Sequence, residues 1–269
     1  MSDLLCIDGS YLAHSAYWGF PGNEDDHQVD GFRISVLRLV KEFKPEYIAL
    51  TFDSPTLIRR EAYPEYKADR DPEVSTSELV RPILEDLELR GIPYLRVEGY
   101  EADDLLATLA RRAASRGTSV RVVGNDLDLV QTLAHPYVRQ VVKKEGEYLE
   151  RTRGDAEQKI GVSVAQYPDL IGLTGSAKDN VPRISLEVSE GGRTITRKIT
   201  APKAVELIRR FGGLEGIYEH ITYLPAKTGA VLRSGKDQAF FFRDLVRLRE
   251  DVEISVDPAL LRVSDWDLS

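Results

Sequence analysis

Acidic residues gather at two places between residues 96 and 131 of this 269-residue chain. Glu101, Asp103 and Asp104 stand at the start of a helical pattern, and Asp126 and Asp128 follow a short apolar strand. A helix followed by a strand is half of a βαβ crossover, so both groups stand at the ends of rigid elements. Acids in the first turn of a helix also suit its positive end, and either group alone needs no chemical role. The two together indicate a functional site.

Two more aspartates come at the ends of apolar runs. Asp8 ends the run that begins at Leu4, and Asp53 ends the run that begins at Tyr47. In an open parallel α/β sheet the carboxyl ends of the strands share one edge, where ligand crevices lie. We therefore expect both aspartates in one cleft with the Asp126 pair, and the acids of the helix start beside them.

Carboxylates crowded at one edge would raise one another's pKa until some took up protons, unless cations kept them ionised. Ligands that are all oxygen favour Mg²⁺ or Mn²⁺ over zinc. The histidines show no ligand spacing; they are His14, His27, His135 and His220. Two divalent ions about 4 Å apart suit hydrolysis of a phosphodiester, since one activates water and the other stabilises the leaving oxygen.

The elements that must hold these residues follow an α/β pattern. Helical spacing over about 31–43, 78–90 and 101–116 alternates with the apolar strands. Cys6 excludes an internal disulfide and is expected to be a small buried hydrophobe. No run approaches the roughly 18 apolar residues of a membrane helix, and the N-terminus is too short and acidic for a signal peptide. We expect a cytoplasmic monomer without a membrane partner.

The net charge of −8 would argue against nucleic acid as a partner only if the charge were spread evenly. The acids assigned to the metal site account for the excess of negative charge. The stretch from Arg183 to Glu250, in contrast, carries more Lys and Arg than Asp and Glu. Nucleic acid therefore stays open as a partner.

Residues 58–74 interrupt the α/β pattern with basic and aromatic side chains. These are Arg59, Arg60, Tyr63, Tyr66, Lys67 and Arg70. Two prolines disfavour one continuous helix. A solvated charged loop is the simpler interpretation. The interpretation favoured here is a mobile basic segment over the cleft, in which tyrosines stack on bases and cations hold phosphate.

The second half of the chain is less regular. Short helices are expected over 155–176. Residues 184–199 alternate about a turn at Gly191-Gly192, which predicts a β-hairpin whose second strand is basic and includes Arg197. Helices are expected from about Pro202 to Phe211 and from Asp237 to Arg249, the last packing on the core.

Several short motifs recur in a fixed order along the chain. They are Ile7-Asp8-Gly9-Ser10, Phe52-Asp53, Tyr63 to Arg70, Tyr100 to Asp104, Asp126 to Leu129, Asp179 to Pro182 and Phe211 to Glu215. In these motifs the chain resembles the 5′→3′ exonucleases and flap endonucleases of bacteria and phages, including the 5′-nuclease domain of DNA polymerase I. Each motif is weak alone, but the ordered set is specific.

The resemblance implies a fold and a reaction. Residues 1–150 would form an α/β core with a parallel-type sheet, PIN-like, carrying a helical arch at about 56–92. Residues 151–269 would hold a helix–three-turn–helix region that binds duplex DNA. The implied activity is hydrolysis of DNA at 5′ ends, 5′ flaps and single-strand/duplex junctions with two Mg²⁺ or Mn²⁺ ions.

The resemblance also assigns roles to residues. The metal ligands would be Asp8, Asp53, Glu101, Asp103, Asp104, Asp126, Asp128 and Asp179. Lys67 and Arg70, with Asp126, would be catalytic, the two cations stabilising charge on the scissile phosphate. DNA contacts would come from Arg59, Arg60, Tyr66, Lys67, Arg70, Arg197, Lys198 and Lys203.

Three departures from the family pattern stand out. Ser176 replaces an aspartate three residues before Asp179, which predicts a weakened second metal site. The segment from Lys198 to Lys203 replaces a Gly-Ile-Gly-type hairpin, which calls the family's K⁺ site into question. Ser15 stands where an arginine is common.

Two alternatives to a DNA nuclease stay open. The first is a junction-binding protein with weakened or lost catalysis, which Ser176 and the altered duplex-binding element suggest. The second is an RNA-directed nuclease of a related α/β fold, against which the match of the arch segment argues.

Overall fold

The computed structural model describes residues 3–19, 25–68 and 76–266. Its chain forms two compact units. The first comprises residues 1–61, 71–153 and 248–269, and the second comprises 62–70 and 154–247. The division predicted at residue 150 stays a prediction.

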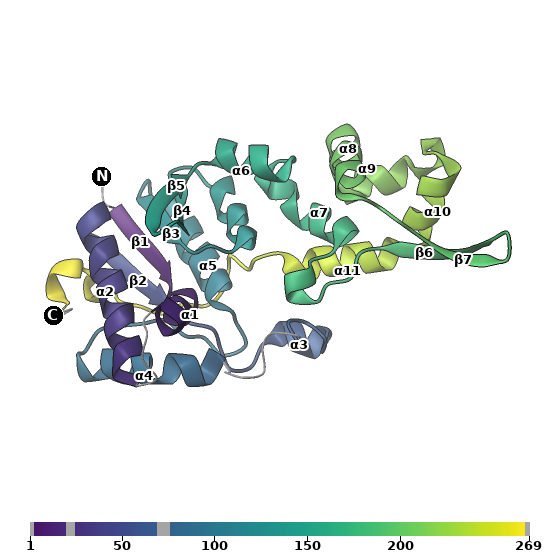
Figure 1. The fold of residues 1–269 in the computed structure, drawn as a ribbon. Coiled ribbons are helices and arrows are strands. Elements are labelled where there is room, and N and C mark those ends of the chain that lie inside the picture. The colour runs from purple at the N-terminus through teal and green to yellow at the C-terminus, as the bar shows by residue number, and fades with distance from the viewer. Residues whose placement is uncertain (1–2, 20–24, 69–75, 267–269) are drawn as a thin grey trace. The chain divides into compact units, whose positions relative to one another are not determined.

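A five-stranded sheet forms the centre of the first unit (Figure 1), in the order β2-β1-β3-β4-β5. Its strands are β1 Asp3–Asp8, β2 Tyr47–Thr51, β3 Ser119–Val123, β4 Val138–Lys144 and β5 Glu147–Arg151. The first four run parallel, and β5 returns antiparallel to β4. This sheet confirms the predicted α/β class.

Helices cover both faces of the sheet. The helices of this part of the chain are α1 Gly9–Gly19, α2 Asp25–Phe43, α3 Ile58–Ala62, α4 Thr76–Leu89, α5 Ala102–Ala114 and the 3₁₀ helix η1 Leu127–Ala134, of which α3 does not lie on the sheet. Side chains of a strand point alternately to its two faces. Leu5 and Ile7 accordingly join one core with α1, α2 and α4, while α5 packs on β1 and β3 from the other side.

Helix α4 lies within the predicted arch. Its inward side chains Val80, Ile83, Leu84 and Leu87 belong to the same core as α1 and α2. The arch predicted over about 56–92 stays a prediction, and α4 within it packs on the core. Residues 69–75 lie outside the described part of the chain.

The second unit is mostly helical and carries one two-stranded sheet. Its helices are α6 Arg153–Ile160, α7 Tyr167–Thr174, α8 Ala201–Phe211, α9 Leu214–Glu219, α10 Ala226–Ser234 and α11 Lys236–Val246. The strands β6 Ser185–Glu190 and β7 Arg193–Lys198 pair antiparallel, as the alternation predicted. Of the helices described, none is long and apolar enough to cross a membrane.

Helix α11 ends three residues before the predicted position. After Val246 the chain is extended, and in the first unit the backbone of Val252 and Ile254 accepts hydrogen bonds from Arg112 of α5, at 2.7 and 3.0 Å.

Candidate functional site

The parallel register places three predicted ligands at one edge of the sheet. Asp8 pairs with Thr51 of β2, and Ile7 pairs with Val123 of β3. Asp53 and Asp126 follow those partners within three residues. All three aspartates therefore leave the sheet at its carboxyl edge, as parallel strands require.

Each of these carboxylates accepts a backbone hydrogen bond from the segment that follows the edge. Asp8 Oδ1 accepts from Tyr11 N at 2.9 Å, and Asp126 Oδ1 accepts from Asp128 N at 2.9 Å. Asp53 Oδ1 accepts from Ala102 N, at the start of α5, at 2.8 Å. Bonds from N–H groups favour the ionised carboxylate and fix its orientation. The backbone around the edge thus fixes the orientation of the three carboxylates.

Two glycines let the backbone approach these acids closely. A Cβ at Gly9 would lie 2.5 Å from the ring of Phe52, and one at Gly124 would lie 2.6 Å from Leu129 Cδ1 and 3.8 Å from Asp8 Oδ2. No side chain fits at such distances without a shift of its neighbours. Small residues at both positions therefore keep the space beside Asp8.

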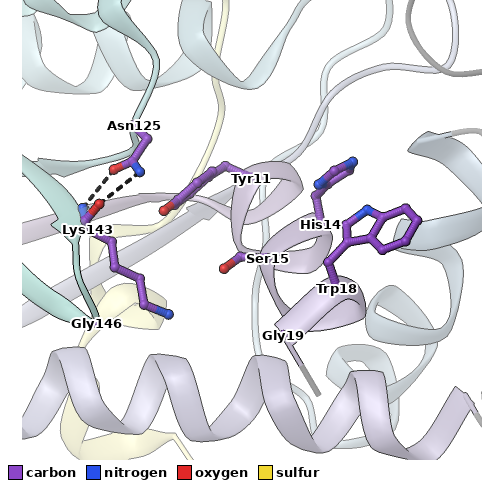
Figure 2. Close-up of a pocket in the computed structure, with 8 residues that line it drawn as sticks. All are labelled: Tyr11, His14, Ser15, Trp18, Gly19, Asn125, Lys143 and Gly146. Carbon is purple, nitrogen blue, oxygen red and sulfur yellow. Dashed lines mark hydrogen bonds between the residues drawn. The ribbon is translucent and has the colours of Figure 1, made fainter. Parts of the chain in front are cut away.

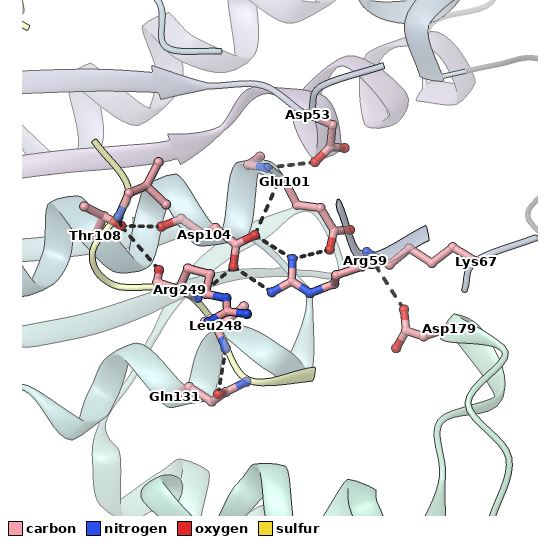
Figure 3. A network of polar contacts seen from close by, with 12 residues as sticks. Asp53, Arg59, Lys67, Glu101, Asp104, Thr108, Gln131, Asp179, Leu248 and Arg249 are labelled. Atoms are coloured by element: carbon pink, nitrogen blue, oxygen red, sulfur yellow. Dashed lines mark hydrogen bonds and ion pairs between the residues drawn. The ribbon is translucent and has the colours of Figure 1, made fainter. Parts of the chain in front are cut away.

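The start of α5 holds the other acidic group. Glu101 is the N-cap residue, and its side chain forms a capping box with Asp104. Asp103 is half-buried, whereas Glu101 and Asp104 are buried. Arg59 donates to Glu101 Oε2 at 2.7 Å and to both oxygens of Asp104, at 2.5 and 2.7 Å (Figure 3).

The surroundings of Arg59 bear on its predicted contact with DNA, which stays a prediction. Its side chain is 7% exposed and its guanidinium is held by two carboxylates. Contact with a DNA phosphate would require those ion pairs to break inside the protein, which is strongly unfavourable. Arg59 is therefore a buried structural cation, and its neighbour Arg60 on α3 is the exposed one.

The second unit holds Lys67, Ser176 and Asp179 together. Ser176 Oγ donates to Asp179 Oδ2 at 2.6 Å, and Lys67 Nζ lies 4.0 Å from Asp179 Oδ1. The Lys67 backbone N–H donates to the Asp179 carbonyl at 3.0 Å. Segment 62–68 is thereby fastened to the turn at 176–181.

This fastening buries two residues predicted to contact DNA. Lys67 is 6% exposed and Tyr66 is 3% exposed, and the Lys67 ammonium lies 5.0 Å from the centre of the Tyr66 ring. A contact with DNA by either would require it to leave this position. Their catalytic and stacking roles stay predictions.

The remaining predicted DNA contacts differ in their surroundings. Arg197 is half-buried and pairs with Glu190 across the hairpin, and Lys203 pairs with Glu206 at 2.7 Å. Lys198 is exposed at the end of β7. Arg70 lies outside the described residues.

A cavity of about 440 Å³ opens beside the sheet edge in the first unit (Figure 2). It is lined by Tyr11, His14, Ser15, Trp18, Gly19, Asn125, Lys143 and Gly146. Asn125 joins β3 to β4 through two bonds with the backbone of Lys143, at 2.7 and 3.1 Å. Burial, with Tyr148 and Asp8 nearby, raises the pKa of Tyr11 to about 12, so this phenol stays protonated at neutral pH.

Sequence reasoning missed this cavity although a signal was present. Tyr11, His14, Ser15 and Trp18 recur at the spacing of a single helix face. Lys143 gave no comparable signal, because it meets that face only through the pairing of distant strands. Cys6 matches its expectation, since burial raises the pKa of its thiol to about 12 and leaves it unreactive.

Within residues 3–19, 25–68 and 76–266, no three His, Cys, Asp or Glu side chains form a group that could hold a metal ion as they stand. The donor set at the sheet edge nevertheless suits Mg²⁺ or Mn²⁺ in kind, because every candidate atom is a carboxylate oxygen. Asp8 and Asp128 are also buried, and a divalent cation would offset the cost of burying their charges. The residues at the edge therefore fit a hard divalent cation.

Comparison with known proteins covers the whole chain. A family model described as the N-terminal resolvase-like domain of 5′-3′ exonuclease matches residues 3–161, and one described as its C-terminal SAM fold matches residues 162–269. DNA polymerase I of Bacillus caldotenax is 34% identical over 94% of the chain and 29% of its own length. That of Borreliella burgdorferi is 34% identical over 83% of the chain and 24% of its own length. The chain thus spans less than a third of these relatives.

Two solved structures share the fold. The flap endonuclease of bacteriophage T5, in a complex with DNA and metal ions, has a TM-score of 0.71 at 21% identity and covers 91% of this chain and 89% of its own. The catalytic core of Rad2 in complex with a DNA substrate has a TM-score of 0.61 at 15% identity, over 96% and 81% of the two chains.

Proposed function

Because the chain belongs to the 5′-3′ exonuclease family, we propose that it hydrolyses DNA phosphodiesters at 5′ ends, at 5′ flaps and at junctions of single strand and duplex. The observation that carries the proposal is the common sheet edge of Asp8, Asp53 and Asp126, fixed by the parallel register and by the bonds their carboxylates accept. The T5 and Rad2 structures with DNA support the class of substrate.

The proposed cofactor is a divalent cation, Mg²⁺ or Mn²⁺. When bound, it would supply a Lewis acid that activates water and stabilises charge on the phosphate. The residues proposed to hold it in the first unit are Asp8, Asp53, Glu101, Asp103, Asp126 and Asp128. Asp179 is proposed as a ligand from its motif alone.

The chain's own residues supply orientation. The amides of Tyr11, Ala102 and Asp128 each fix one carboxylate, so the acids need little rearrangement when an ion binds. Ser10 Oγ accepts a hydrogen bond from Asp53 N at 2.9 Å and ties the start of α1 to the end of β2. The exposed Arg60 on α3 is proposed to contact phosphate.

The test uses a labelled 5′-flap substrate with Mg²⁺ or Mn²⁺. The wild type should release short 5′ products, and Asp126→Ala should lower the rate by more than about 100-fold, since even outer-shell partners of metal ligands are worth 10- to 100-fold. Asp30→Ala is the matched control, because Asp30 is an exposed acid paired only with Arg33 among the contacts described. An unchanged rate in Asp126→Ala would remove the sheet edge from the mechanism.

A second candidate function is junction binding without catalysis. Ser176 favours it, because its hydroxyl donates to Asp179 where a carboxylate ligand would be expected. On this alternative the wild type binds the flap substrate and releases no product at any concentration of Mg²⁺ or Mn²⁺. Cutting an RNA strand of the same shape faster than DNA would instead support an RNA-directed nuclease.

A further inference from the structure

Two segments that lie near the junctions of the two units meet on one buried carboxylate. The chain first leaves the first unit after Glu61, and it returns there for the last time at Leu248. Arg59 lies two residues before the first of these positions, and Arg249 lies one residue after the second. Both are bonded to Asp104, and all of these contacts lie within the first unit (Figure 3).

The carboxylate of Asp104 accepts hydrogen bonds on both oxygens. Oδ2 accepts from Arg59 Nη1 at 2.5 Å and from the backbone N–H of Glu101 at 3.4 Å. Oδ1 accepts from Arg59 Nη2 at 2.7 Å and from the backbone N–H of Arg249 at 2.8 Å. With an exposed fraction of 0%, Asp104 has its hydrogen-bonding capacity used within the protein.

Further bonds extend this contact along the returning segment. Thr108 Oγ1, one turn along α5, donates to the Arg249 carbonyl at 3.3 Å and accepts from Val252 N at 3.3 Å. Gln131 Oε1 of η1 accepts from Leu248 N at 3.2 Å. The segment 248–252 is therefore bound along α5 and η1 by polar contacts that begin at Asp104.

These contacts oppose a role for Asp104 as a metal ligand. A bidentate arginine–carboxylate pair is among the strongest hydrogen-bonded contacts in proteins. An ion that took an oxygen of Asp104 would leave the buried Arg59 without its main counter-charge, which is strongly unfavourable. The neighbouring Asp103, in contrast, is only half-buried.

We propose that Asp104 is a positioning residue and not a metal ligand. With Arg59 it forms a clasp that fastens Arg59 itself and residues 248–252 to α5, and through Arg59 it orients Glu101. The orienting part rests on the proposed function, because it matters for catalysis only if Glu101 binds a cation. The clasp itself does not depend on that function.

Three variants test the clasp. Asp104→Asn removes the charge that holds Arg59. Arg59→Lys keeps the charge but loses the fork that reaches both oxygens of Asp104. Asp103→Asn, one residue away, is the matched control, since it changes the same charge on the same helix turn. For each, amide hydrogen exchange is measured over 248–252, and Mn²⁺ binding is measured by calorimetry without DNA.

Asp104→Asn and Arg59→Lys should each speed exchange at the Arg249 amide by about 10-fold or more, as expected when a hydrogen bond to a charged group is weakened. Exchange at the Val252 amide, which lies on the same segment and donates to Thr108 Oγ1, should rise with it. Asp103→Asn should leave those amides as protected as in the wild type. The effects on Mn²⁺ affinity should have the opposite order. Asp103→Asn should weaken Mn²⁺ binding most, and Asp104→Asn and Arg59→Lys should weaken it by about 10-fold, the effect of an outer-shell partner. The number of bound ions should be unchanged in Asp104→Asn and Arg59→Lys.

The proposal is overturned if Asp104→Asn removes one bound Mn²⁺ while the amides of Arg249 and Val252 stay protected. It is also overturned if Asp103→Asn and Asp104→Asn raise exchange equally. If Asp104→Asn does not fold, Arg59→Lys alone decides, because unchanged exchange in that variant contradicts the clasp. If the wild type binds no Mn²⁺, the proposed function is contradicted. The hydrogen-exchange measurements still test the clasp in that case, because they do not depend on metal binding.

Discussion

The sheet edge of the first unit and the segment 176–198 of the second are held by different kinds of structure. At the sheet edge, strand register fixes Asp8, Asp53 and Asp126, and backbone amides orient their carboxylates. In the segment 176–198, Asp179 is held by side chains, Ser176 and Lys67, and a β-hairpin follows. The first arrangement depends on main-chain geometry and the second on the identity of single side chains.

This difference predicts how each region responds to amino-acid substitution. Main-chain geometry at the sheet edge tolerates few substitutions, because moving one strand moves several acids. Contacts made by single side chains can be exchanged locally, and two of the three departures from the family pattern, Ser176 and the stretch that starts at Lys198, begin in this segment. We therefore expect substitutions at the sheet edge to affect folding and activity together, and those in the segment 176–198 to affect metal or DNA binding with a smaller loss of stability.

The largest effect is expected from Gly9→Ala. The new Cβ would lie 2.5 Å from the buried Phe52 ring, so overpacking should lower the free energy of unfolding by about 1–3 kcal/mol and displace the adjacent Asp8. Urea unfolding and the flap assay should show both losses.

Gly19→Ala is the control for this comparison, since it lies in the same helix and its Cβ would meet nothing within 4 Å. Equal stability of the two variants would show that Phe52 moves aside at no cost, and would weaken the case that packing fixes Asp8.

A smaller effect is expected from Ser176→Asp. It places a second carboxylate against Asp179 in place of a donated hydrogen bond of 2.6 Å, and like charges should cost about 1 kcal/mol without a cation. The thermal midpoint should fall in EDTA and recover with Mn²⁺. Ser176→Ala, which loses the bond without adding charge, should fall and not recover. If Mn²⁺ raised the thermal midpoint of Ser176→Asp and of Ser176→Ala equally, position 176 would have no part in binding a second metal.

The smallest effect is expected on the hairpin. Lys198→Ala removes an exposed cation and should weaken flap-DNA binding by a few-fold and lower the slope of log affinity against log salt by about 1, as for one lost phosphate contact. Arg197→Ala should change less, because Arg197 already pairs with Glu190. Fluorescence anisotropy with Ca²⁺ as the divalent ion measures both, and the opposite order would assign the contact to Arg197.

Much of the sheet was predictable because its strands are apolar runs of ordinary length. The hairpin β6–β7 could also be predicted, because apolar and polar residues alternate on both sides of Gly191-Gly192. Helix α1 and the pair β4–β5 were not predicted: α1 is short and mixes aromatic and polar residues, and β4 carries arginine and lysines among its valines. Elements of mixed composition are hard to predict from sequence when it is neighbouring strands that bury their side chains.

The site was predictable in its acids and not in their roles. Asp8, Asp53 and Asp126 stand at strand ends, and this position can be read from the chain. The separate role proposed for Asp104 depends on Arg59 and on Arg249, 145 residues further along, and no local pattern contains that contact. The same holds for Lys67, whose burial against Asp179 joins residues more than a hundred positions apart.

The most direct measurement is a crystal of the wild-type chain soaked in Mn²⁺, with anomalous scattering used to locate the ions. The account predicts at least one ion bound by carboxylates from the ends of β1 and β3, including Asp8 and Asp126, while Asp104 keeps both bonds to Arg59. An edge without an ion at saturating Mn²⁺, or an ion bound to Asp104 with Arg59 displaced, would contradict it.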